Sequence, residues 1–170
     1  MELAALNGMS AERFVEALGG IYEHSPWVPA AVVDQRPFAG LPQLTAALAA
    51  AVANAGPAAQ LALIRAHPEL GARLKVAEVL TAASAAEQQG AGLDQCSSEE
   101  YAALTRLNAD YQRRFGFPFI LAVKGHNRQS IIAAMRERLD HDPATERAEA
   151  LRQIDRIAGF RLAALFAEQD

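Results

Sequence analysis

The chain has 170 residues, a mass of 18.2 kDa and a formal net charge of −4 at neutral pH. Hydrophobic residues make up 51% of it and charged residues 21%, which is typical of a globular protein and excludes a disordered one. The negative charge argues against a nucleic-acid-binding protein, and no apolar run approaches the roughly 20 residues that a membrane-spanning helix needs.

Two features bear on the cellular compartment. Cys96 is the only cysteine, so no internal disulfide can form, and this fits a reducing environment. The first residues lack the basic region and apolar core of a secretory signal, and the last three are not the peroxisomal address S-K-L. We therefore expect a cytoplasmic protein.

In the first half of the chain, capping residues and apolar spacing predict successive helices. Ser10 is a favourable N-cap for a helix that the glycines at 19–20 end. Pro26 occupies the first position of the next helix. Residues 56–57, Gly-Pro, separate two further helices, the second of which ends at His67. The apolar residues expected to face the core are Phe14, Leu18, Leu44, Leu48, Val52, Leu61 and Ile64.

The second half carries equally clear helix signals. Ser97 and Glu100 form a capping-box pair, and Gly116 ends the helix that they open. Asp142 caps the last helix, which begins at Pro143. The apolar positions are Tyr101, Leu104, Leu107, Tyr111, Ile131, Ile132, Met135, Leu139, Leu151, Ile154, Ala158, Leu162 and Leu165. With no repeat, linker or domain boundary, the sequence predicts an all-α, compact helical bundle that forms a single domain over residues 1–170.

One segment, residues 115–123 with the sequence "FGFPFILAV", does not fit a helix. Pro118 favours an extended conformation at Phe117, and the unbroken apolar run indicates burial. Buried backbone groups outside a helix need hydrogen-bond partners. Two interpretations remain: the segment is a core-filling crossover between two helices, or a ligand satisfies some of its N–H and C=O groups.

His67 lies at the end of a predicted helix and directly before Pro68. The proline keeps the histidine out of the α region, so the imidazole sits on an extended bend. It either interacts with the carboxyl end of the helix or gives and takes protons near neutral pH.

Residues 84–88, "SAAEQ", also have two interpretations. Ser84 and Glu87 match a capping box that opens a short helix, which would be a purely structural role. Gln88 adds an amide that both donates and accepts hydrogen bonds, so the same stretch suits the binding of a polar ligand.

Arg161 falls inside the apolar arc of the last predicted helix, between Ile157 and Leu165. Arginine is almost never buried unless it is paired. The side chain therefore extends past the stripe to solvent, pairs with an internal carboxylate, or meets an anionic ligand in a cleft. No metal-binding motif accompanies these residues, since His67 and Glu69 lack an H-E-x-x-H pattern or a Cys/His cluster.

Taken together, the motifs resemble those of the 2-oxo-4-hydroxy-4-carboxy-5-ureidoimidazoline (OHCU) decarboxylases of the urate-to-allantoin pathway. The matching motifs are "HPEL" at 67–70, "SAAEQQGAGL" at 84–93, "NADYQRRFGFPFI" at 108–120 and "RL" at 161–162. Their order and spacing also fit, over nearly the whole chain. The resemblance implies a compact all-α fold, a homodimer, and decarboxylation of OHCU to (S)-allantoin without a cofactor or metal.

The resemblance also implies roles for individual residues. His67 corresponds to the catalytic proton donor, Glu87 to a second essential group, and Arg161 to an arginine in the same pocket. The segments that correspond to the substrate-binding ones contain Pro68, Ser84, Ala85, Ala86, Glu87, Gln88, Phe119, Ile120, Leu121, Ala122 and Val123. The backbone N–H groups around Phe119–Ala122 are candidates to bind a developing oxyanion. The alternative is a non-catalytic helical module that binds a small anionic, ureide-like metabolite at the same place.

Overall fold

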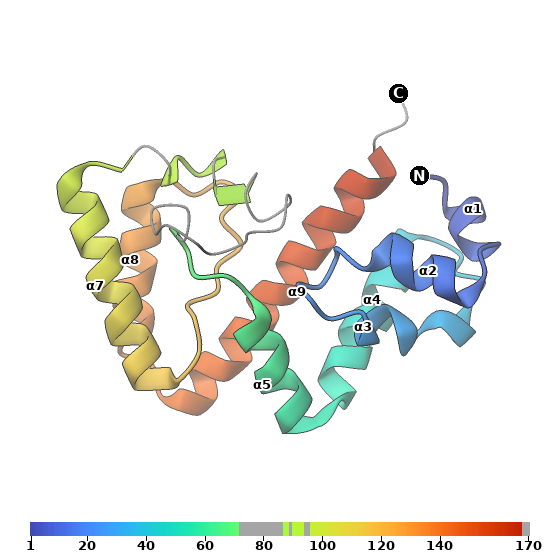
Figure 1. Ribbon diagram of the computed structural model, residues 1–170, viewed down its shortest axis with the longest axis horizontal. Helices are drawn as coiled ribbons and strands as arrows, with labels where there is room; N and C mark the ends of the chain where they lie inside the picture. The colour runs from blue at the N-terminus through green and yellow to red at the C-terminus, as the bar shows by residue number, and fades with distance from the viewer. Residues whose placement is uncertain (72–86, 89, 94–95, 168–170) are drawn as a thin grey trace. The chain divides into compact units, whose positions relative to one another are not determined.

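A computed structural model describes residues 1–71, 87–88, 90–93 and 96–167 of the chain (Figure 1). Within these ranges the structure delimits eight α-helices and one short 3-10 helix, residues 87–88 are also helical, and no strand is present. This confirms the all-α prediction. No single helix in the described part of the chain has the length and apolar composition to cross a membrane, and the helices Leu41–Asn54 and Gly56–Ala66 meet those criteria only as a pair bent by 115°.

The described residues form two compact units. One comprises Met1–Ala66 and Asp155–Asp170, and the other His67–Ile154. One boundary lies between Ala66 and His67, and the other lies between Ile154 and Asp155, within the last helix. That residues 1–170 form a single domain stays a prediction.

The first unit contains most of the shorter helices. They are α1 (Leu3–Asn7), α2 (Ala11–Leu18), α3 (Trp27–Ala30), the 3-10 helix η1 (Val33–Gln35), α4 (Leu41–Asn54) and α5 (Gly56–Ala66). The Ser10 side chain accepts a hydrogen bond from the Arg13 backbone N–H, so the predicted cap is confirmed. Pro26 is the N-cap of α3 rather than its first residue. Of the predicted core positions in this unit, Leu61 and Leu165 are only half-buried and the others are buried, and Leu63 is buried in addition.

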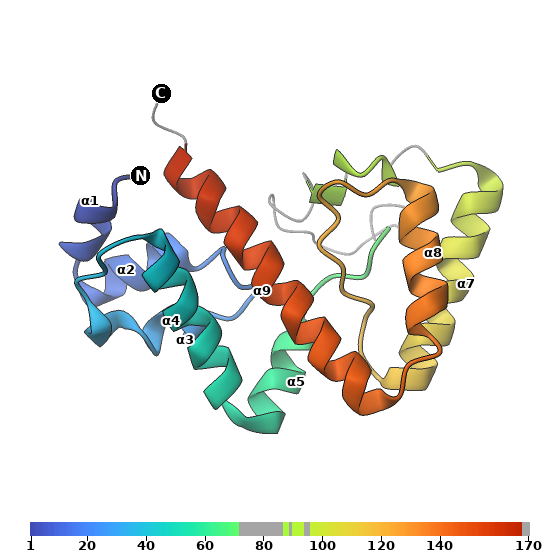
Figure 2. The same ribbon diagram turned by 180° about the vertical axis from the view of Figure 1, so that it is seen from behind.

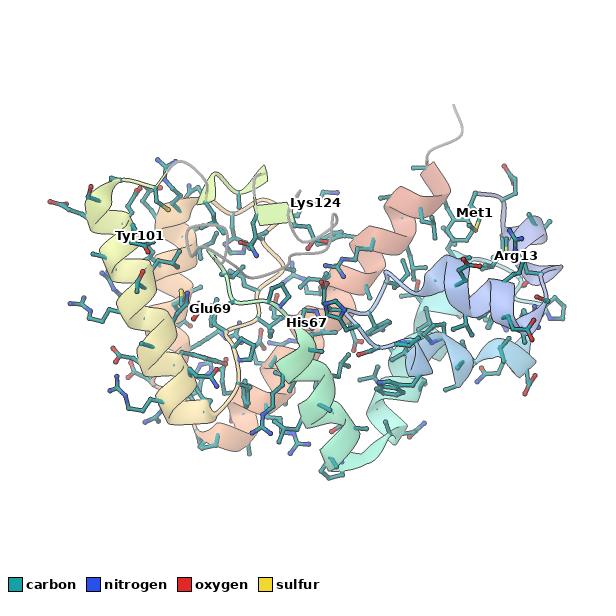
Figure 3. All side chains as sticks on the ribbon, viewed as in Figure 1. Met1, Arg13, His67, Glu69, Tyr101 and Lys124 are labelled. Atoms are coloured by element: carbon teal, nitrogen blue, oxygen red, sulfur yellow. The ribbon has the colours of Figure 1, made fainter. Side chains whose placement is uncertain are left out.

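The second unit is built on α7 (Ser98–Phe115), α8 (Arg128–Arg138) and the first part of α9 (Pro143–Ala167). Both hydrogen bonds of the Ser97–Glu100 capping box are present, and Gly116 ends α7 with a left-handed φ of 75°. Asp142 accepts hydrogen bonds from two N–H groups in the first turn of α9. The prediction that Tyr101 is buried with the apolar face of α7 is wrong: it lies in the first turn and is 38% exposed (Figure 3).

Helices α7 and α8 lie side by side and run in the same direction (Figures 1 and 2). Residues 116–127 connect them, and this non-helical stretch returns from the end of α7 to the beginning of α8. Tyr111 contacts Phe117 and Phe119 edge-on, which ties the connection to α7. The interpretation of "FGFPFILAV" as a buried crossover is therefore confirmed. It leaves open whether a ligand also uses the segment.

Candidate functional site

His67 lies on a bend directly after the last residue of α5 (Figure 3). The histidine is buried, with 7% of its surface exposed, and Pro68 and Glu69 are half-buried. Gly71 follows with a φ of 79°, a conformation that glycine adopts without strain. The bend therefore carries a buried imidazole, and Pro68 and Gly71 favour its backbone conformation.

Two side-chain amides hold the residues that follow His67. The Gln88 Oε1 atom accepts a hydrogen bond from the Gly71 N–H at 3.0 Å, and its Nε2 atom lies 3.5 Å from the Glu69 carbonyl oxygen. From α7, the Asn108 Nδ2 atom donates to the Leu70 carbonyl oxygen at 2.8 Å. Gln88 and Asn108 are both buried. Their contacts fix the backbone three to four residues beyond the imidazole.

Glu87 and Gln88 are helical, and Glu87 is half-buried. The Glu87 carbonyl oxygen accepts a hydrogen bond from the Ala91 N–H at 3.2 Å. Ser84, Ala85 and Ala86 lie outside the described residues, so the predicted Ser84–Glu87 capping box remains a prediction. Both interpretations of "SAAEQ" therefore stay open.

The second predicted binding segment, residues 119–123, is buried along its whole length. Two of its backbone groups are bound by side chains from neighbouring helices. The Arg138 Nη1 atom on α8 donates to the Ile120 carbonyl oxygen at 2.5 Å, and the Gln153 Oε1 atom on α9 accepts from the Ala122 N–H at 2.9 Å. The N–H of Ala122 is thus bound to a side chain of the protein, and its role as an oxyanion donor stays a prediction.

Leu121 lies between these two anchored residues. Its N–H and C=O have no hydrogen-bond partner among the described residues, although Leu121 is only 7% exposed. Buried backbone polar groups are nearly always paired in native proteins. Leu121, like Phe119, is therefore a part of the segment whose backbone groups are open to a polar ligand.

A buried ionic network supports the Arg138 side chain. Its Nε atom donates to Glu146 Oε1 at 2.7 Å, the Tyr111 hydroxyl donates to the same oxygen at 2.5 Å, and His141 Nδ1 lies 2.9 Å from Oε2. Burial, reinforced by the hydrogen bond to Glu146, raises the pKa of Tyr111 well above its ordinary value. The hydroxyl therefore stays protonated and keeps donating at physiological pH.

Arg161 belongs to the first unit, where it is buried on α9. Its Nη1 atom lies 2.8 Å from Glu23 Oε2 and 3.2 Å from the Gly20 carbonyl oxygen. The structure thus bears out pairing with an internal carboxylate, one of the alternatives that the sequence left open. A catalytic role for Arg161 stays a prediction.

Sequence reasoning did not single out several of these polar residues. Arg138 occupies an apolar position of α8, seven residues after Ile131, and Gln153 lies seven residues after Glu146 on the buried face of α9. The test that drew attention to Arg161, a polar residue at an apolar position of a helix, would also have identified Arg138, Glu146 and Gln153. Asn108 and Glu23 carry no comparable signal. Among the described residues, no group of three or more His, Cys, Asp or Glu side chains is arranged to hold a metal ion.

Comparisons with known proteins extend the motif resemblance. A sequence model described as OHCU decarboxylase matches residues 7–163. The 2-oxo-4-hydroxy-4-carboxy-5-ureidoimidazoline decarboxylase of Haloferax volcanii is 44% identical over 99% of this chain and 98% of that protein. The protein of the same name from Halalkalicoccus jeotgali is 41% identical, over 97% and 92% respectively. A crystal structure of (S)-allantoin synthase is similar with a TM-score of 0.80 and 30% identity, and the match covers 97% of this chain and 54% of that one.

Proposed function

Because this chain belongs to the OHCU decarboxylase family, we propose that it decarboxylates 2-oxo-4-hydroxy-4-carboxy-5-ureidoimidazoline to (S)-allantoin in urate degradation. The observation that carries the proposal is the 44% identity to the Haloferax volcanii decarboxylase over essentially both chains. The local geometry supports the proposal. His67, which corresponds to the family's histidine, is buried, and hydrogen bonds hold the backbone that follows it at Leu70 and Gly71.

The reaction asks three things of the protein. The bond between the tetrahedral ring carbon and the carboxylate breaks, CO₂ leaves, and the bonding electrons spread into the ring as an enolate-like anion. The protein has to stabilise that charge, accept the proton of the hydroxyl group as its carbon becomes the ring carbonyl of allantoin, and deliver a proton to the neighbouring ring carbon that carries the ureido group. We assign the proton transfer to His67, because an imidazole is the side chain best suited to give and take a proton near neutral pH.

We assign substrate orientation to Glu87 and to the segment 119–123. A carboxylate at Glu87 accepts from the ureide N–H groups, and charge-assisted hydrogen bonds are about twice as strong as neutral ones. The Leu121 N–H binds the developing oxyanion, a contact whose loss typically costs about 3 kcal/mol. The Gln88 amide already contacts residues 69–71, so its first task is to hold the His67 bend. Pro68 and residues 84–86 complete the lining.

We propose that Arg161 attracts the substrate carboxylate. Its pairing with Glu23 moderates this attraction, and that suits the reaction, because a guanidinium that held the carboxylate tightly would stabilise the ground state and slow the loss of CO₂.

The functional protein is a cytoplasmic homodimer that uses no cofactor or metal.

The proposal is tested by generating the substrate in situ from urate and following its disappearance with and without the protein. We expect the protein to accelerate the loss of substrate in proportion to its concentration. If the protein binds the ureide and does not accelerate its loss, the proposed enzymatic function is wrong and the protein is a non-catalytic binding module.

A further inference from the structure

We propose that Gln153 and Arg138 are positioning residues that set the register of the segment 119–123, so that the backbone groups of Leu121 face the substrate. This inference rests on the proposed function, because it assumes that the segment binds the substrate. Neither side chain needs to touch the substrate. Each acts through the backbone group that it binds.

The two anchors hold positions that are two residues apart. Arg138 binds the carbonyl of Ile120 from α8, and Gln153 binds the N–H of Ala122 from α9. In extended backbone the N–H and C=O groups of successive residues point to opposite sides. An extended backbone between the two anchors would place the anchored groups of Ile120 and Ala122 on one side and the N–H and C=O of Leu121 on the other. A slip by one residue would exchange the two sets.

Both anchors are themselves fixed. The Arg138 guanidinium stacks over the Phe119 ring, 4.3 Å from its centroid, and pairs with the fully buried Glu146. The Gln153 Nε2 atom donates to Glu149 Oε1 at 2.7 Å, which orients the amide so that its oxygen faces Ala122. In each anchor, one atom of the head group binds the segment and another binds a carboxylate of a neighbouring residue. Neither anchor is therefore free to follow the segment to another register.

The register has a consequence for catalysis. If the Leu121 N–H binds the charge that develops as CO₂ leaves, its placement matters more in the transition state than in the ground state. Misplacing it by a fraction of an ångström lowers kcat and leaves KM nearly unchanged. A side chain that only fills the core would change stability without this separation.

The experiment compares Gln153→Met, which keeps the volume and removes the acceptor, with Ser97→Ala. The control removes the N-cap of α7 and so destabilises the same unit without touching the segment 119–123. For each purified protein, kcat and KM are measured with substrate generated from urate, well below the melting temperature. We expect kcat of Gln153→Met to fall at least fivefold below that of Ser97→Ala, with KM changed by less than threefold. A smaller fall in kcat, or a larger change in KM, overturns the inference.

A double variant, Glu149→Gln with Gln153→Glu, exchanges the two side chains. It keeps an acceptor for the Ala122 N–H, restores a donor–acceptor pair and leaves the net charge unchanged. We expect it to recover kcat to within threefold of wild type, and a kcat as low as that of Gln153→Met overturns the inference. If Gln153→Met does not fold, Gln153→Asn takes its place under the same criterion. Wild-type protein without turnover contradicts the proposed function itself, whereas an active wild type with an equally active Gln153→Met contradicts only the positioning role.

Discussion

His67 combines burial with a backbone that is anchored shortly after it, at Leu70 by Asn108 and at Gly71 by Gln88. Such an arrangement holds an imidazole in one direction, which a proton donor needs and a helix-end partner does not. His67→Asn keeps a polar side chain and removes the imidazole.

We expect His67→Asn to fold with a nearly unchanged melting temperature and to lose almost all acceleration of substrate decay. Steady-state kinetics with substrate generated from urate measure this. A rate within tenfold of wild type corresponds to less than about 1.4 kcal/mol of barrier and would remove His67 from the mechanism.

A substitution at Glu87 distinguishes a structural role as a helix cap from a catalytic role. A capping box accepts Gln in place of Glu, so Glu87→Gln costs little stability in either case. If Glu87 holds the ureide N–H groups by its charge, the same change lowers kcat/KM strongly. Ser84→Ala is the matched variant: we expect it to lose about 1 kcal/mol of stability and to keep more activity. Normal turnover by Glu87→Gln would leave Glu87 with a structural role only.

The buried pair of Arg161 and Glu23 makes single substitutions hard to interpret. Removing one partner of a buried ion pair typically costs 3–5 kcal/mol, whereas replacing both with apolar residues is often neutral. We expect Arg161→Met to lower the melting temperature markedly and Glu23→Leu with Arg161→Met to restore it. The double variant should stay inactive if Arg161 binds the substrate carboxylate. A stable double variant with wild-type kcat/KM would show that the pair is structural.

At this scale the sequence identified residues whose types are unusual for their place. Arg161 in an apolar arc and His67 before a proline are such cases, and both are buried in the structure. Asn108 and Glu23 escaped, because each acts through partners that are 38 and 138 residues away in the chain. Contacts of that kind depend on how distant segments pack, and no local sequence pattern predicts them.

The helical elements follow from local chemistry more directly. Ser10, Ser97 and Asp142 cap the helices that the sequence assigned to them, and Gly116 ends α7 in the left-handed conformation. Such signals act within one turn, and the sequence displays them in full. The errors lie where burial depends on the partner: Tyr101 and Leu139 have the right spacing, but the structure leaves them exposed and half-buried, and Arg138 is buried instead.

The cap of α7 leads to a prediction for pH. The hydrogen bond from the Ser97 N–H lowers the pKa of Glu100 below its ordinary value of 4.5, and the facing Arg128 guanidinium acts in the same direction. An acid whose pKa is lowered on folding stabilises the folded state above its unfolded pKa, and this contribution is lost as the pH falls through the folded pKa. We expect wild type to melt at a higher temperature than Glu100→Gln near neutral pH.

Thermal unfolding of both proteins over a range of pH provides the measurement. The difference in melting temperature should shrink steadily once the pH falls below 4.5, because protonated Glu100 resembles the amide. A difference that stays constant through this range would mean that the charge of Glu100 contributes nothing to stability.

The crossover between α7 and α8 connects the element scale to the whole molecule. Two helices that run in the same direction need a returning connection, and a buried connection needs partners for its backbone. The chain supplies them at Ile120 and Ala122 from α8 and α9, and supplies none among the described residues at Leu121. The sequence indicated a buried non-helical segment. Which of its groups are occupied depended on side chains from two other helices.

At the scale of the whole molecule, the family match over residues 7–163 accounts for the motifs together, where each alone had a structural explanation. The mechanism that we propose on this basis is that one imidazole, presented from one side, delivers the proton after CO₂ has left. Protonation from a single side of a planar intermediate gives a single enantiomer. Protonation by solvent gives both.

The optical activity of the allantoin formed from OHCU tests this claim most directly. Urate is oxidised in situ, the protein is added, and circular dichroism is recorded while substrate loss is followed in parallel. We predict that (S)-allantoin alone accumulates, and that the dichroic signal rises at the same rate at which the substrate disappears. Racemic allantoin that forms as fast as the substrate is consumed would contradict the account, because the proton would then come from solvent and not from His67.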